Sequence, residues 1–113
     1  MKNILFITLI FLTGQTQAQS ADTLKSFTFE VKNLHCDGDM PAIQKNLLNQ
    51  EGIDEVSFTK RKKQASVFTV LFHTAATRPE QIKAAVENTA GCDAPDEKPY
   101  RVGHAFEPKI TTP

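Results

Sequence analysis

The spacing of apolar residues switches repeatedly between a period of two and a period of about 3.6, and this feature most limits the fold. Phe27, Phe29 and Val31 alternate with polar residues, which predicts a half-buried strand. From Met40 the apolar residues recur at helical spacing, and Gly52 marks the end of that helix. The remaining segments are strands over 56–58 and 65–73 with a polar hairpin connection at 60–64, a helix between 77 and 91, and a final strand over 100–106.

The order of these segments is strand, helix, strand, strand, helix, strand. Two helices and one antiparallel sheet pack most simply as two layers. We therefore predict an α+β chain with the ferredoxin-like β-α-β-β-α-β fold, in which both helices cover one face of a four-stranded antiparallel sheet. The domain spans residues 24–106, and the proline-containing residues 107–113 form an irregular tail. Thr77 and Glu80 match a capping box at the start of the second helix. The expected core consists of Phe27, Phe29, Val31, Ile43, Leu47, Val56, Phe58, Phe68, Val70, Ile82 and Val86.

Residues 1–18 match a secretory signal peptide. Lys2 gives a positive start, residues 4–12 form an apolar core too short to cross a membrane, and residues 16–18 offer a small-residue cleavage site. The alternative is that this segment is a buried strand or helix of the domain. Cleavage after Ala18 would deliver a secreted chain to an oxidising compartment, where two cysteines can pair.

The composition argues against several classes of function. Basic and acidic side chains number 13 each, so the formal net charge is zero, whereas nucleic-acid-binding domains are clearly basic. No apolar run reaches the roughly 18 residues of a membrane span. A cysteine–histidine catalytic pair would need an orienting third group, and the sequence indicates none. We expect no nucleic-acid partner, no membrane span after signal cleavage and no enzymatic activity.

The loop between the first strand and the first helix resembles the metal-binding loop of the heavy-metal-associated domain family, which includes small copper chaperones and the periplasmic mercury-binding protein. The family pattern is Gly-Met-Thr-Cys-x-x-Cys. Here Asn33, Leu34 and His35 occupy the first three places. Cys36 matches the first metal cysteine, and Asp39 stands in place of the second. Residues 51–56, 65–72 and 82–87 are similar to later family segments. The resemblance covers residues 26–94 and implies the ferredoxin-like fold.

The resemblance also implies a position for the second sulfur. In the family, the loop after the second helix returns beside the metal loop, and Cys92 lies in the corresponding loop here. Oxidised, Cys36 and Cys92 would form a disulfide; reduced, they would be two thiolate ligands with His35 or Asp39 as a third donor. Both states remain open. Asp39 also has a second interpretation, which we favour, as the N-cap of the first helix.

The signal-peptide pattern predicts a secreted, periplasmic protein. The family resemblance implies that it binds or carries a soft metal ion, with Cu(I) or Hg(II) as the first candidates and Zn(II) as the second. The candidate ligands are Cys36, Cys92, His35 and Asp39. The resemblance implies a membrane metal transporter or another metal-binding protein as partner, and we expect a monomer. The alternative is a structural or interaction module with the same fold, whose loops are joined by a Cys36–Cys92 disulfide.

Overall fold

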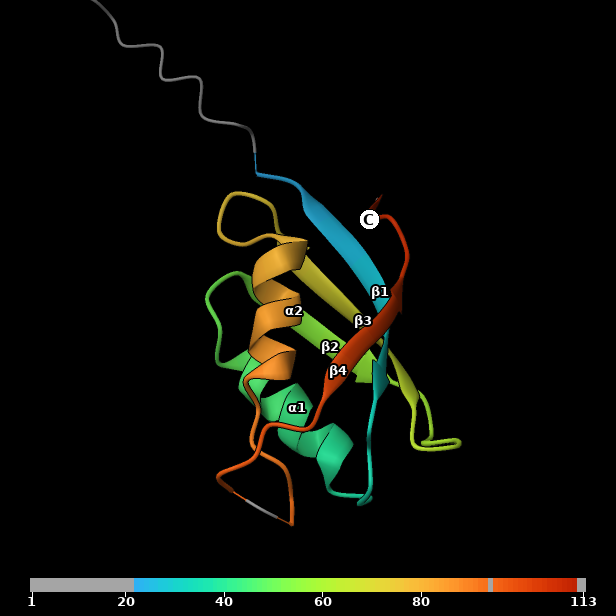
Figure 1. The fold of residues 1–113 in the computed structure, drawn as a ribbon. Helices are drawn as coiled ribbons and strands as arrows, with labels where there is room; N and C mark the ends of the chain where they lie inside the picture. The colour runs from blue at the N-terminus through green and yellow to red at the C-terminus, as the bar shows by residue number, and fades with distance from the viewer. Residues whose placement is uncertain (1–21, 94, 112–113) are drawn as a thin grey trace, which may run out of the picture.

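The computed structural model describes residues 22–93 and 95–111 and contains seven elements (Figure 1). They are β1 (Leu24–Lys32), α1 (Asp39–Leu48), β2 (Ile53–Phe58), β3 (Ser66–His73), α2 (Pro79–Glu87), β4 (Arg101–Ala105) and β5 (Lys109–Ile110). The predicted α+β class, with an antiparallel sheet and two helices, is confirmed. The predicted signal peptide lies outside the described residues.

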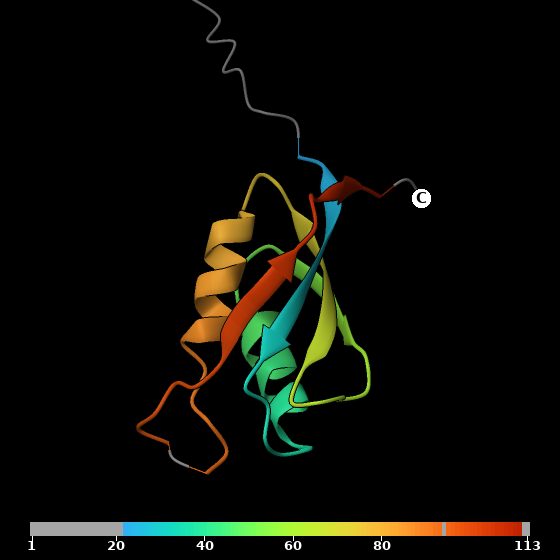
Figure 2. The same cartoon turned by 45° about the vertical axis from the view of Figure 1, so that its right-hand side comes forward.

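All strand pairs are antiparallel, and the strands lie in the order β2-β3-β1-β4. The central strand β1 pairs with β3 on one side and with β4 on the other. β5 continues along the β4 side of β1. Figures 1 and 2 show both helices on the same side of the sheet. They also show that the loops before α1 and after α2 lie at the same end of the molecule.

The core lies between the sheet and the two helices. Ten of the eleven expected core residues belong to one buried cluster, and the eleventh, Phe58, is partly buried and packs against it. The same cluster contains Leu34, Phe72 and Tyr100, which were not among the expected core residues. Leu34 and Tyr100 come from the two loop regions at one end of the sheet, so the core extends to that end.

The C-terminal part of the chain departs from the prediction. The final strand was expected to alternate through residue 106, but Phe106 is 51% exposed. The register of β4 against β1 shifts between Phe29 and Val31, and this irregularity breaks the expected period of two. The tail is not wholly irregular, because β5 pairs with Lys25 and Ser26.

The predicted capping box at the start of α2 is wrong. Arg78 occupies the N-cap position in an extended conformation, without a side-chain cap, and Pro79 begins the helix. The Thr77 hydroxyl donates to the Gln81 side chain at 3.2 Å instead of accepting a bond from a free backbone N–H. The fixed φ of proline favours this helix start without a capping side chain.

The polar connection predicted between β2 and β3 is confirmed, and it ends in a tight two-residue turn. Lys62 and Ala65 exchange backbone hydrogen bonds of 2.8 and 3.0 Å. Lys63 and Gln64 between them have positive φ angles of 52° and 65°, as a type I′ hairpin turn requires. The Gln64 carbonyl accepts a bond from the Leu34 N–H at 2.9 Å. The hairpin tip is thereby attached to the loop that carries Cys36.

Candidate metal and disulfide site

The loop between β1 and α1 is held at both of its ends. Asn33 leaves β1 with a positive φ of 69°, a conformation that asparagine tolerates better than most residues. Its side-chain amide donates to the Pro99 carbonyl at 2.8 Å. Near the other end of the loop, Arg61 forms an ion pair with Asp37 at 2.8 Å. Cys36 lies between these two contacts.

Asp39 organises this loop from inside the protein. It is the first residue of α1 and is only 1% exposed. One carboxylate oxygen accepts the backbone N–H groups of His35 at 2.7 Å and Cys36 at 2.9 Å. The other accepts the hydroxyl of the buried Tyr100. The N-cap prediction for Asp39 is wrong, because Gly38 holds that position and the carboxylate points back to the loop.

These contacts set the charge state of the buried pair. Burial raises the pKa of Asp39, but the hydrogen bonds from Cys36, Tyr100 and His35 outweigh it and leave the pKa below its ordinary value. Burial, together with the bond to Asp39, raises the pKa of Tyr100 above its ordinary value. The pair therefore consists of an ionised carboxylate and a neutral phenol that donates to it. Both carboxylate oxygens of Asp39 are occupied by protein donors.

The loop after α2 brings the second cysteine to the first loop. The Gly91 N–H donates to the Glu97 carbonyl at 3.0 Å, and this bond closes a short loop that contains Cys92. The chain then passes through Pro99 and Tyr100, which contact the first loop through Asn33 and Asp39. Two contacts besides the cysteines therefore join the loops.

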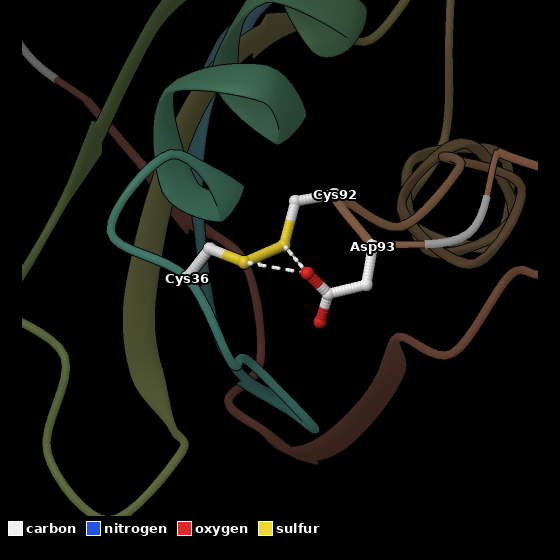
Figure 3. Close-up of side chains that lie close together, drawn as sticks. All are labelled: Cys36, Cys92 and Asp93. Atoms are coloured by element: carbon white, nitrogen blue, oxygen red, sulfur yellow. Dashed lines mark hydrogen bonds between the residues drawn. A yellow bond between two sulfur atoms is a disulfide. The ribbon is translucent and has the colours of Figure 1, made fainter.

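Cys36 and Cys92, which are 56 positions apart in the chain, form a disulfide (Figure 3). Their Cα atoms are 6.6 Å apart, within the usual range for disulfides. Cys36 is partly buried and Cys92 is exposed, so one side of the bond faces solvent. The predicted proximity of the two sulfurs is confirmed, and the oxidised alternative is the one present in the structure.

A third group, the carboxylate of Asp93, lies beside both sulfurs. Its Oδ1 atom is 3.6 Å from the Cys36 sulfur and 3.5 Å from the Cys92 sulfur (Figure 3). Sulfurs in a disulfide carry no hydrogen, so these approaches become hydrogen bonds only in the reduced form, where a thiol S–H can donate. Among the described residues, Cys36, Cys92 and Asp93 form a group whose ligand atoms all lie within 4.8 Å of one another.

The other two predicted ligands, Asp39 and His35, lie outside this group. Asp39 is committed to the loop N–H groups and to Tyr100, and the His35 side chain is exposed. Neither offers a ligand atom within 4.8 Å of the whole group. Both residues nevertheless line a cavity of about 210 Å³ beside the disulfide, together with Cys92, Asp93 and Glu97. His35 therefore borders the candidate site, whereas Asp39 supports its backbone.

Two residues of the site were not predicted from the sequence. Asp93 directly follows Cys92, and that adjacency was the available signal, because the loop was already expected to return to the first one. Tyr100 was assigned only to a strand pattern. Its bond to Asp39 joins residues 61 positions apart, a pairing that no local pattern contains.

None of the helices in the described part of the chain is long and apolar enough to cross a membrane. A scan against models of known protein families and a search of curated proteins gave no match for this chain.

Proposed function

We propose that this protein is a secreted domain of the heavy-metal-associated type, with a ferredoxin-like fold, that binds one soft metal ion through Cys36 and Cys92 when both are reduced. The strand order β2-β3-β1-β4, with both helices on one side, supports the fold. The signal-peptide pattern of residues 1–18 supports secretion. The disulfide is then the oxidised, metal-free form.

The observation that carries this proposal is that two sulfurs from loops distant in the sequence lie together, and that contacts other than the disulfide also hold those loops together. The Asn33–Pro99 and Asp39–Tyr100 contacts hold the two loops together separately. After reduction, two thiols would therefore remain neighbours at the protein surface. Paired thiolates are the preferred ligands of Cu(I) and good ligands of Zn(II), and binding requires that they lose their protons.

The test is a metal titration of the reduced and the oxidised protein under anaerobic conditions. Reduced protein should bind one Hg(II), Cu(I) or Zn(II) ion per chain, and oxidised protein should bind none at the site. Cys36→Ser and Cys92→Ser should each lose most of the affinity. His104→Gln is the matched control, since His104 is an exposed potential ligand on β4. Serine variants that bind as well as the reduced wild type would reject the proposal.

A second candidate is favoured by the disulfide itself: a module for structure or interaction in which the bond only joins two loops. A bond that closes a loop of this length contributes about 4 kcal/mol by the chain-entropy estimate. Thiol counting on protein purified without reductant separates the candidates. Two free thiols, or a bound ion, favour metal binding. No free thiols, together with no metal uptake after reduction, favours the structural module.

A further inference from the structure

We propose that Asp93 is the third ligand of the site, and that the resulting set of two sulfurs and one oxygen selects Zn(II) over Cu(I). This inference rests on the proposed function and specifies its ion. It replaces His35 and Asp39, the third donors expected from the sequence, with a residue from the loop that carries Cys92.

The position of the Asp93 carboxylate fits a zinc ion. In a tetrahedral site with Zn–S bonds of about 2.3 Å and a Zn–O bond of about 2.0 Å, sulfur and oxygen lie about 3.5 Å apart. Oδ1 of Asp93 lies 3.5 and 3.6 Å from the two sulfurs. The oxygen therefore already stands at this separation from each sulfur, and reduction frees the sulfurs to move apart from each other.

The carboxylate has no protein partner that explains its position. Among the described residues, no N–H or O–H group donates to the Asp93 side chain, and its two close approaches are both to cysteine sulfurs. With both cysteines as thiolates, three negative groups would lie within 4.8 Å, an arrangement that repulsion disfavours without a cation. A divalent cation between them removes that repulsion and uses all three groups.

The donor set distinguishes zinc from copper. Cu(I) is satisfied by thiolate and thioether ligands and gains little from a carboxylate, whereas Zn(II) accepts sulfur, nitrogen and oxygen in four-coordinate sites. We assign the fourth position to water from the cavity that borders Cys92 and Asp93. Asp93 should therefore matter strongly for zinc and little for copper.

The experiment compares Asp93→Asn with wild type in the reduced state, using Zn(II), Cu(I) and the spectroscopic probe Co(II). Asp96→Asn is the matched control, because it removes one nearby exposed acidic charge outside the ligand group. Asp93→Asn should lower Zn(II) affinity about tenfold or more, at least the loss typical of disrupted groups around metals, without a comparable change for Cu(I). It should also weaken the visible absorption of tetrahedral Co(II). Asp96→Asn should leave all three measurements unchanged.

The outcomes separate this inference from the proposed function. If Asp93→Asn and wild type bind Zn(II) equally, or if Asp93→Asn and Asp96→Asn weaken it equally, Asp93 is not a ligand, although the two cysteines can still bind an ion. If the reduced wild type binds no ion at all, the proposed function fails and this inference fails with it. Equal melting temperatures of the oxidised variants and wild type would show that the fold is intact.

Discussion

At the scale of single residues, a buried hydrogen bond from Tyr100 holds the Asp39 carboxylate, which in turn accepts the backbone N–H groups of His35 and Cys36 in the cysteine loop. Tyr100→Phe keeps the ring and removes the donor, so a buried carboxylate loses one partner. Hydrogen bonds to charged groups contribute about 1.5–3 kcal/mol, and we expect the free energy of unfolding to fall by that amount. Urea unfolding of the oxidised protein measures it.

The hydroxyl pair of Thr28 and Thr69, 3.2 Å apart, provides the comparison for Tyr100→Phe. Both of its partners are neutral, so Thr69→Val should lower the free energy of unfolding by less, about 0.5–1.5 kcal/mol. Equal losses for the two variants would mean that the charge of Asp39 adds nothing to its bond with Tyr100.

We expect His73 to make the stability of the protein depend on pH near neutrality. Its ring lies between Asp22, at 2.7 Å, and Asp54, at 3.2 Å. These bonds, the one to Asp22 first, raise the pKa of His73. Its stabilising contribution is therefore fully present below the unfolded pKa of about 6.5 and is lost as pH rises through the higher folded pKa. Bonds from the Ala75 N–H and His73 lower the pKa of Asp22, whose contribution is lost as pH falls toward acid values.

We therefore expect the melting temperature of the wild type to fall as pH rises from 6 to 8 more than that of His73→Gln. Thermal unfolding over this range measures the difference. His104→Gln is the control, because the only ring contact of His104 among the described residues is with Phe106. The ion-pair explanation fails if the melting temperature of His73→Gln falls with pH as steeply as that of the wild type.

At the scale of elements, each helix covers a backbone group on one edge of the sheet. From α1, the Gln44 side chain donates to the Val56 carbonyl of edge strand β2 at 2.7 Å. From α2, the Glu87 carboxylate accepts the Val102 N–H of β4 at 2.9 Å. Unpaired groups on edge strands can pair with other chains. These bonds fasten the helices to the sheet, and we expect the same side chains to protect it from edge-to-edge association.

Gln44→Ala should lower the free energy of unfolding by about 0.5–1.5 kcal/mol, and Glu87→Ala, which removes a charged acceptor, by about 1.5–3 kcal/mol. Both variants should increase self-association. Urea unfolding and light scattering measure the two effects. Glu87→Gln keeps an oxygen acceptor and should therefore retain most of the stability that Glu87→Ala loses. An unchanged scattering signal in both alanine variants would show that the edges are protected in another way.

Periodicity was sufficient to predict the type and order of the elements up to α2, because one face of each segment is buried and the other is not. It did not give their bounds, since α1 ends at Leu48 and β2 begins at Ile53, three residues before Val56. It was not sufficient for β4, where a register shift exposes Phe106. Asp39 shows a second limit. An acidic residue beside a helix start usually caps it, but here a buried phenol 61 positions away stabilises a different orientation. Asp93 was missed because its significance depends on the meeting of two loops, which is a property of the tertiary structure.

At the scale of the whole molecule, one core joins the sheet to both helices, and its aromatic residues should dominate stability. Phe29 and Phe68 are fully buried and their rings lie 6.0 Å apart. Replacing either with alanine should lower the free energy of unfolding by about 3–5 kcal/mol. Phe106→Ala, at an exposed position, should change it by less than about 0.5 kcal/mol. Urea unfolding measures these losses. A loss for Phe106→Ala as large as those of the two core variants would contradict this packing.

The Cys36–Cys92 bond also divides the chain into a covalent ring, residues 36–92, and two arms. The arms pair with each other, since β1 precedes the ring while β4 and β5 follow it. The Thr111 N–H donates to the Leu24 carbonyl at 3.0 Å, so the outer parts of the arms lie together. A force applied to their ends would peel β1 from β4 and β5 and from β3 of the ring, but the disulfide would keep the chain of residues 36–92 from extending.

Reduction would expose residues 36–92 to that force and would increase the length of the stretched chain by roughly 200 Å. Single-molecule stretching with and without a reductant would measure this length, and equal extensions would mean that the ring is not closed in solution. Under tension, the end-to-end length of this protein would therefore depend on the redox state of its surroundings.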